Sequence, residues 1–275
     1  MRAHIPIVTL VLLLTRAVVP GLTAATANAE VITVCWDGSG DYLTIQEGID
    51  AAQDGDEVVV CDGVYTGLGN KNLDFAGKAI TVRSANGPDN CIIDCENEGR
   101  GFYFHSGETA ASVVDGFTIT NGNADVGGAI YWASGDAWYE SGPTIMNCWI
   151  LGNTALNGGG VSGGYSLTEY GATIANCLVA GNSATGSDIW FGGGGIHASW
   201  CELEIRNCTI ANNWAAGLGG GVNSVVAGLI IRNCTIAGNQ ADGEWGGGGV
   251  YVNGFTWLVM ANCTVTRNEA VCGGV

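Results

Sequence analysis

Aromatic and acidic side chains gather around five recurring positions in the second half of this 275-residue chain. Each position follows a Gly-Gly-apolar step, and together they hold Tyr131, Ser162, His197, Asn223 and Tyr251. Aromatic rings stack on sugar rings, and two carboxylates can serve as acid and base at a glycosidic bond. The pattern therefore predicts glycan-binding candidates at Tyr131, Trp138, Tyr139, His197, Trp200 and Tyr251, and weaker catalytic candidates at Glu140, Glu169 and Glu202.

A purely structural interpretation of these residues stays open. Surface aromatics can brace large loops on a glycine-rich core, and the isolated histidines His105 and His197 can be structural. A convergent pair of carboxylates in a groove on the Tyr131–Tyr251 face would favour an enzyme over a binding protein. A lyase needs a base, and the basic residues outside the N-terminal leader described below are few: Lys71, Lys78, Arg83, Arg100, Arg206, Arg232 and Arg267.

The elements that must position these side chains come from an internal repeat. The unit Ile231-Arg232-Asn233-Cys234-Thr235-Ile236 has four relatives, whose cysteines are Cys148, Cys177, Cys208 and Cys263. A glycine-rich run ending in an apolar residue follows each of the first four copies in the chain, as in Gly158-Gly159-Gly160-Val161. A fixed period of this size indicates stacked structural repeats.

Within one repeat the apolar positions change phase, which predicts the path of a coil. Ile145 and Cys148 cannot share one face of a single strand, because side chains alternate along a strand. A tight turn at Asn147 resolves this, since asparagine tolerates a left-handed backbone. A third strand opens at Val161, with Asn153 and Ala155 in the loop before it. Three short strands per coil, each coil about 4.8 Å above the last, make an all-β parallel β-helix.

Two columns of identical residues follow from that stacking. The asparagines form a hydrogen-bonded ladder and the cysteines an inward column: Asn147, Asn176, Asn207, Asn233, Asn262, and Cys148, Cys177, Cys208, Cys234, Cys263. An earlier coil aligns Val114, Gly116, Phe117 and Ile119 to the same positions. We interpret the cysteines as small buried hydrophobes rather than a redox or metal column. Asn207, Asn233 and Asn262 begin N-glycosylation motifs, but we expect burial of the ladder to prevent modification.

The segment before the repeats, residues 30–112, is predicted to cap the stack. Thr44-Ile45-Gln46-Glu47 forms a capping box for a helix that runs to about Gln53. Strands are expected over 31–34, 57–61, 78–83, 91–94 and 101–104, with a turn at Asp62-Gly63. The chain contains eleven cysteines, and Cys35 with Cys61 and Cys91 with Cys95 are plausible local disulfides.

Two segments resemble known families. The opening Asp37-Gly38-Ser39-Gly40-Asp41-Tyr42-Leu43-Thr44-Ile45-Gln46, followed by Gly63-Val64-Tyr65, resembles the start of pectin methylesterases, which are pectin-lyase-like right-handed β-helices. That resemblance implies a right-handed, single-stranded β-helix whose first coil is plugged by the helix. The family's Gln-Asp step and Asp-Phe-Ile-Phe-Gly run do not follow the opening, so its activity is not carried over. An Asp-Asp pair of the polygalacturonase type is also absent.

The repeats themselves are similar to those of bacterial polymorphic outer-membrane proteins. Gly127-Gly128-Ala129-Ile130 and Asn153-Thr154-Ala155 carry that likeness over residues 113–275. The resemblance implies a cell-surface protein with an adhesive, structural or glycan-binding role. The alternative is a carbohydrate-active enzyme, a lyase, hydrolase or esterase, acting on acidic polysaccharide.

The net charge and the two ends of the chain limit the expected partners and location of the protein. A net charge of −17 argues against nucleic acid, and it leaves room for Ca²⁺ while we expect no other cofactor or metal site. Residues 1–29 read as a secretory signal peptide, and no later apolar run is long enough to span a membrane. We therefore expect a secreted or surface protein, bacterial by its repeats, with polysaccharide or surface proteins as partners. Cys272-Gly273-Gly274-Val275 begins a new coil, so we expect further material to cover the last one.

Overall fold

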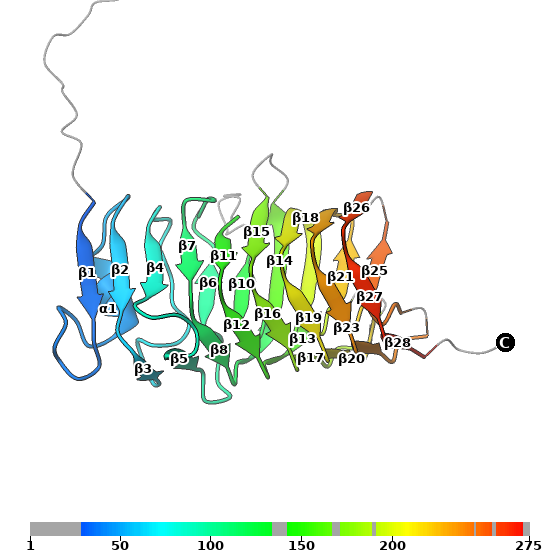
Figure 1. Ribbon diagram of the computed structural model, residues 1–275, viewed down its shortest axis with the longest axis horizontal. Helices are drawn as coiled ribbons and strands as arrows, with labels where there is room; N and C mark the ends of the chain where they lie inside the picture. The colour runs from blue at the N-terminus through cyan, green and yellow to red at the C-terminus, as the bar shows by residue number, and fades with distance from the viewer. Residues whose placement is uncertain are drawn as a thin grey trace, which may run out of the picture.

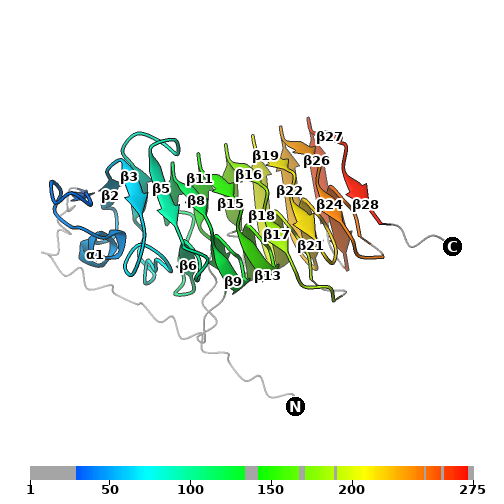
Figure 2. The ribbon, with the colours of Figure 1, turned by 90° about the horizontal axis from the view of Figure 1, so that it is seen from below.

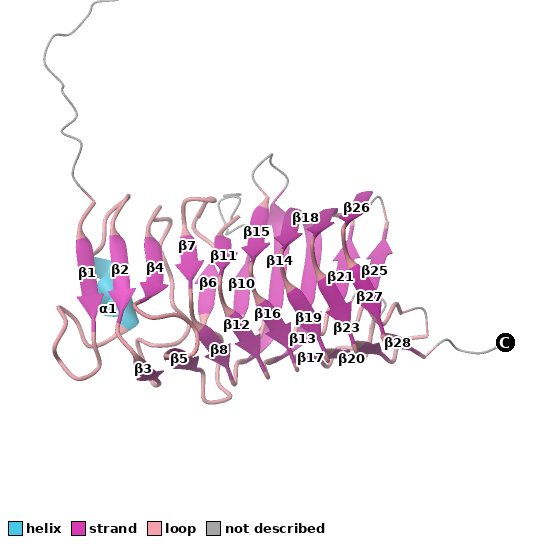
Figure 3. Ribbon diagram, viewed as in Figure 1, coloured by secondary structure: helices cyan, strands magenta, loops and turns pink. Residues whose placement is uncertain are grey.

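The protein is a straight stack of parallel coils that runs from β1 at one end to β28 at the other (Figure 1). The structure is a computed structural model, and it describes residues 29–133, 142–166, 171–188, 191–244, 246–254 and 257–271. Strands make up almost all of its regular structure, with one short helix at the N-terminal end (Figure 3). The predicted parallel β-helix is therefore confirmed.

The described strands form four parallel ladders along the stack, which we call sheets 1 to 4 in the order that each coil meets them. Sheet 1 holds β1 (Val31–Val34), β2 (Glu57–Val60), β4 (Thr81–Ser84), β7 (Val113–Asp115), β11 (Thr144–Met146), β15 (Ala172–Ala175), the second half of β18 (Ile196–Arg206), β22 (Gly228–Arg232) and β26 (Trp257–Ala261). Sheet 2 holds β3 (Gly63–Tyr65), β5 (Cys91–Asp94), β8 (Thr118–Thr120), β12 (Trp149–Leu151), β16 (Leu178–Ala180), β19 (Thr209–Ala211), β23 (Thr235–Ala237) and β27 (Thr264–Thr266).

The other two sheets complete the coil. Sheet 3 holds β9 (Asn123–Val126), β13 (Thr154–Asn157), β17 (Ser183–Ala184), β20 (Trp214–Ala215), β24 (Gln240–Ala241) and β28 (Glu269–Ala270). Sheet 4 holds β6 (Phe102–Phe104), β10 (Ile130–Trp132), β14 (Val161–Ser166), the first half of β18, β21 (Val222–Val225) and β25 (Val250–Asn253). Sheet 3 occupies the segment that the sequence assigned to a loop, so the later coils have a fourth, short strand. Likewise, β3 begins at the predicted turn residue Gly63.

The N-terminal end is closed by α1 (Ile45–Ala51), which lies beside β1 and β2 (Figure 1) and at the end of the stack in Figure 2. Its capping box is present, because the Thr44 hydroxyl accepts from the Glu47 amide and the Glu47 carboxylate accepts from the Thr44 amide. Ile45 and Ile49 are fully buried against the first coils. The predicted helix is thus confirmed, two residues shorter than expected at its C-terminal end.

The predicted asparagine ladder exists, but it lies on the outside of the coil. Each Nδ2 donates to the Oδ1 of the preceding asparagine, from 3.1 Å at Asn176–Asn147 to 3.3 Å at Asn262–Asn233. Every member has a left-handed backbone, with φ of 54° or 55°. Four of the five are exposed, so the expectation of a buried ladder was wrong. These asparagines occupy the bend between sheets 1 and 2, and their side chains point away from the core. Burial therefore gives no reason to dismiss the N-glycosylation motifs at Asn207, Asn233 and Asn262.

A second asparagine column carries the buried ladder. Asn153, Asn182, Asn213 and Asn239 are at most 1% exposed, and Asn268 continues the column. The Asn182 Oδ1 atom accepts from both the backbone amide and the side chain of Asn153, at 2.9 and 3.0 Å. Its Nδ2 atom donates to the Ile150 carbonyl at 2.9 Å and to Asn213 at 3.0 Å. These side chains satisfy backbone groups at the corner between sheets 2 and 3, where the regular ladder is interrupted.

The repeat cysteines form the predicted inward column. Cys148, Cys177, Cys208 and Cys234 are nearly fully buried, and Phe117 occupies the same position one coil earlier. Contacts run along the column, such as the Cys148 amide donating to the Cys177 Sγ at 3.4 Å. The thiols therefore fill the core, as expected of small hydrophobes.

One predicted disulfide is confirmed and the other is wrong. Cys35 and Cys61 are bonded and join β1 to β2 across the first coil, with 5.0 Å between their Cα atoms. Cys91 and Cys95 are free and buried, and burial raises the pKa of both thiols to about 12. They begin and follow the extended strand β5, so about 13 Å separates their Cα atoms, which is too far for a disulfide.

Candidate functional site

The outward face of sheet 4 carries the column that the Gly-Gly-apolar steps predicted. Tyr131 pairs with Ser162, Ser162 with His197, His197 with Asn223, and Asn223 with Tyr251. The three central residues are at most 3% exposed, whereas the two tyrosines are half-buried. Neighbouring groups therefore cover the middle of this face, and a site there would be a partly enclosed hollow.

Two adjoining hollows lie over this column, and we call them together the sheet 4 groove. The larger encloses about 380 Å³ and is lined by Asn157, Phe191, His197, Ser199, Trp200, Val225 and Val226. The smaller encloses about 190 Å³ and is lined by Val126, Tyr131, Asn157, Ser162, Gly163, Gly164, His197 and Ser199. Asn157, His197 and Ser199 line both. A few polar groups in a largely apolar hollow are typical of a ligand site.

Strained backbone forms one edge of the groove. The chain turns from sheet 4 to sheet 1 at Trp200 in one coil and at Val226 in the next, with φ of 54° and 51°. The equivalent residue of the following coil is Gly254, for which a left-handed conformation is easy. Left-handed φ is unusual for a tryptophan and an outlier for a β-branched valine, and such outliers gather at functional sites. Trp200 is 44% exposed at this corner, where its ring can meet a ligand.

His197 is the titratable group at the centre of the groove. Burial lowers its pKa to about 4, so the imidazole is neutral near pH 7. Its Nδ1 atom lies 3.2 Å from the Asn223 side-chain nitrogen, and the buried Oδ1 atom of Asn223 has no partner among the described residues. The two orientations of the Asn223 amide differ only in which atom faces the histidine. With the nitrogen toward His197, the amide donates to an unprotonated Nδ1; with the oxygen toward it, the amide accepts from a protonated Nδ1. The asparagine can therefore select either tautomer of His197.

The orientation of the Asn157 amide is fixed by a backbone donor. The Gly192 amide, which comes from the next coil, donates to the Asn157 Oδ1 atom at 3.0 Å. Only the oxygen of the amide can accept this bond, so the NH₂ group occupies the other position. Asn157 lines both hollows and can offer that group to a ligand.

The groove continues at Tyr131 into a stack of aromatic rings. Tyr131 and Tyr103 are parallel, with centroids 5.4 Å apart, and His105 stacks on Tyr103 at 4.2 Å. The Arg100 guanidinium lies over both tyrosine rings at 5.3 and 4.9 Å. Burial lowers the pKa of Arg100, and the ring contacts compensate part of the lost hydration. These residues extend the aromatic surface along the outward face of sheet 4.

The predicted carboxylates do not meet in the groove. Glu202 follows the corner and faces out from sheet 1, where it lines a separate hollow of about 190 Å³ with Glu204 and Trp257. The Arg232 Nη1 atom lies 2.6 Å from Glu204. Glu140 and Glu169, like Trp138 and Tyr139, lie outside the described residues. No carboxylate is among the described residues that line the groove, so the pair that would favour a glycosidase is not seen there.

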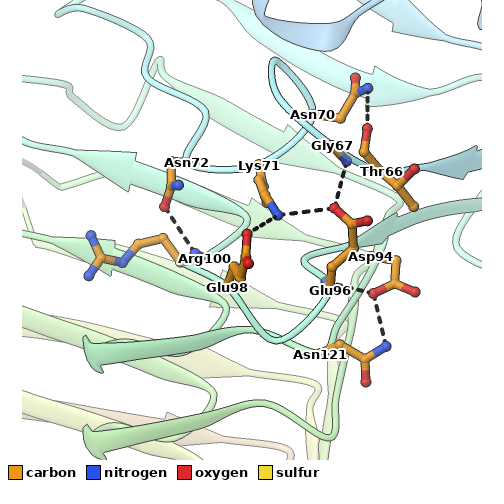
Figure 4. A network of polar contacts seen from close by, with 10 residues as sticks. All are labelled: Thr66, Gly67, Asn70, Lys71, Asn72, Asp94, Glu96, Glu98, Arg100 and Asn121. Carbon is orange, nitrogen blue, oxygen red and sulfur yellow. Dashed lines mark hydrogen bonds and ion pairs between the residues drawn. The ribbon is translucent and has the colours of Figure 1, made fainter.

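Most of the basic residues considered for a lyase are engaged elsewhere. Figure 4 shows Lys71 between Glu96 and Glu98, at 3.0 and 3.1 Å, where hydrogen bonds to these carboxylates raise its pKa. Lys78 donates to backbone carbonyls, and Arg83 pairs with Glu57. Arg206 and Arg232 occupy equivalent positions on sheet 1, as predicted. None of these side chains is among the residues that line the groove.

The described ranges hold neither a cluster of metal-ligating side chains nor a membrane-spanning helix. Within them, no three His, Cys, Asp or Glu side chains gather as a metal-binding group, so Ca²⁺ stays a prediction without a site. In the same ranges, no helix has the length and apolar character needed to cross a bilayer.

Sequence reasoning found the column but missed most of the groove around it. Ser199 and Val225 share a strand face with His197 and Asn223, so a period of two could have found them. Asn157 ends β13 and Phe191 precedes β18 in the next coil, so their meeting depends on the stacking. Trp200, His197 and Tyr131 were predicted as ligand contacts and do line the groove, whereas Tyr251 continues the column beyond the residues that line it.

Comparisons with known proteins agree with the fold. Residues 172–275 match a family model described as a right handed beta helix region. Among solved structures, a pectin methylesterase from carrot shares 13% identity, with a TM-score of 0.43, over 88% of this chain and 83% of that one. Pectate lyase Pel9A shares 16%, with a TM-score of 0.45, over 90% and 82%. A pectin methylesterase from Aspergillus niger shares 15%, with a TM-score of 0.40, over 92% and 88%.

The family match also gives the hand of the helix. The coils form a right-handed parallel β-helix, as the sequence predicted. No curated protein matches the chain. The matches above include no polymorphic outer-membrane protein, so that resemblance stays a prediction.

Proposed function

We propose that this protein is an exported β-helix that binds a glycan in the sheet 4 groove. The observation that carries the proposal is an exposed aromatic ring, Trp200, that shares the larger hollow with the uncharged polar groups of Asn157 and Ser199. These two polar residues also line the adjoining smaller hollow, together with Ser162. Sugar rings offer an apolar face for stacking and hydroxyls at their rim for hydrogen bonds. The groove offers both kinds of contact.

The charge of the groove favours neutral sugar units over uronates at its centre. The described residues that line the groove are uncharged near pH 7, because burial keeps His197 neutral. The chain carries a net charge of −17, which repels polyanions at long range. Arg100 lies at the Tyr131 end and adds one positive charge there.

The Cys35–Cys61 disulfide supports export, since disulfides persist in oxidising compartments outside the cytosol. The predicted leader, residues 1–29, agrees with this location. An adhesive or structural role would need a partner surface, and the groove gives the more specific hypothesis.

A glycan array followed by calorimetry of the best ligand tests the proposal. Trp200→Ala is expected to weaken binding about tenfold, which corresponds to about 1.4 kcal/mol of lost stacking. Trp257→Ala is the matched control, because Trp257 is 46% exposed on sheet 1 outside the groove. No glycan binding in the array, or equal losses in the two variants, would contradict the proposal.

A further inference from the structure

Three residues on successive coils of the groove have the types and order of a nucleophile, a base and an orienting group. Ser162 pairs with His197, and His197 pairs with Asn223, at one outward register position of sheet 4. Adjacent strands lie about 4.8 Å apart, so each side chain stands directly beside the next. Ser162 and His197 line the same hollow. Stacking therefore brings together residues that are far apart in the chain.

The buried amide of Asn223 can hold His197 in the form that a base requires. With its Oδ1 atom toward Nδ1, the asparagine accepts the Nδ1 proton, and the lone pair then lies on Nε2. That orientation pairs the Asn223 Oδ1 atom with His197 and moves the Nδ2 atom to the position that the oxygen held. A base oriented by a third group is the arrangement that activates a serine hydroxyl.

The same hollow holds donors for a developing negative charge. The Gly192 amide donates to the Asn157 Oδ1 atom, which leaves the Asn157 NH₂ group to donate to a ligand. Asn157 and Ser199 line both hollows. Preorganised side-chain amides and hydroxyls stabilise the oxyanion of a tetrahedral intermediate. The site thus combines a nucleophile, a base and oxyanion donors around one volume.

We propose that Ser162, His197 and Asn223 form a catalytic triad that hydrolyses short acyl esters on a sugar hydroxyl. The Ser162 Oγ atom bonds to the acyl carbon while its proton passes to His197 Nε2. The bond from the acyl carbon to the sugar oxygen then breaks, and the sugar alkoxide takes that proton. Water attacks the acyl-serine with His197 again as base, which releases the carboxylic acid and restores Ser162.

The uncharged residues that the structure describes around the groove suit such a substrate, because an O-acyl sugar is neutral before cleavage. The larger hollow beside Trp200 offers room for the sugar ring, and the smaller one beside Ser162 suits a short acyl group. The inference rests on the proposed function for its natural substrate, but the ester chemistry can be tested with small probes that need no glycan.

Covalent labelling gives the direct test. The wild-type protein is treated with a fluorophosphonate probe, and the modified residue is identified by mass spectrometry. Labelling of Ser162 is expected, together with loss of labelling in His197→Gln and retention in the matched control Ser183→Ala, whose serine lies on β17 outside the groove. Labelling of Ser162 in the wild-type protein can be read by itself, so the test does not depend on whether a variant folds. Failure to label Ser162 would overturn the proposal.

Hydrolysis of 4-nitrophenyl acetate gives the second readout. Ser162→Ala is expected to lower the rate about 10³-fold, and His197→Ala about 10²-fold with partial recovery on adding imidazole. Asn157→Ala is expected to lower kcat about 10²-fold. A rate that is unchanged in Ser162→Ala would contradict the triad, even where glycan binding persists. Ester hydrolysis without glycan binding would leave the triad standing and overturn the proposed function.

Discussion

The stability of the coils is expected to depend on the buried asparagine column far more than on the exposed one. Asn182→Ala removes an oxygen that accepts from the Asn153 amide at 2.9 Å and a nitrogen that donates to the Ile150 carbonyl at 2.9 Å. Both backbone groups lose this partner where water cannot replace it. Each buried group left unpaired costs about 1 to 3 kcal/mol. The free energy of unfolding should therefore fall by about 4 kcal/mol.

The exposed column supplies the matched control in the same coil. Asn176→Gly removes two amide contacts at 3.1 Å that water can replace, and glycine adopts its φ of 55° readily. Its cost should stay below about 1 kcal/mol. Urea unfolding followed by circular dichroism measures both variants, and hydrogen exchange reports the Asn153 amide. Equal losses, or a larger loss for Asn176→Gly, would refute the assignment of the ladder's energy to the buried column.

Three further predictions concern strain, the disulfide and pH. Val226→Gly should raise stability by about 1 kcal/mol by relieving the left-handed valine, and a loss in urea unfolding would show that no strain is stored there. Replacing Cys35 and Cys61 by serine should lower the free energy of unfolding by about 3.5 kcal/mol, because the disulfide closes a loop with a sequence separation of 26 residues. Thermal unfolding with and without a reductant measures this loss. The His197 pKa of about 4 lies below its value in the unfolded chain. The contribution of neutral His197 to the free energy of unfolding is therefore complete above about pH 6.5 and is lost as the pH falls to about 4. Over that range the free energy of unfolding should fall by about 3 kcal/mol. His197→Gln should remove that part of the pH dependence, and an unchanged slope would contradict the burial of a neutral imidazole.

The repeat could be predicted from sequence because its columns depend only on local alternation. Ile145, Cys148 and Ile150 point inward as expected, and the pairing of Ile145 with Ile174 follows from the period. The capping box at Thr44 is equally local. Such features need no knowledge of what lies across the coil.

The buried ladder and the groove depend on contacts that the pattern does not encode. Asn147 and Asn153 are the same residue type at the same period, and only the backbone at each corner decides which one faces the core. Cys91 and Cys95 are near in sequence but separated by an extended strand. Asn157 meets Phe191 and Gly192 only because two coils stack. Tyr131, His197 and Trp200 could be predicted as residues of the site, whereas Asn157, Phe191 and the hollow that they line could not.

A crystal structure of the protein with the best oligosaccharide from the array would locate the bound glycan directly. We expect one sugar ring stacked on Trp200, with hydroxyls bonded to Asn157 and Ser199 in the sheet 4 groove. An oligosaccharide bound beside Trp257 in the hollow of sheet 1, with the sheet 4 groove empty, would contradict it.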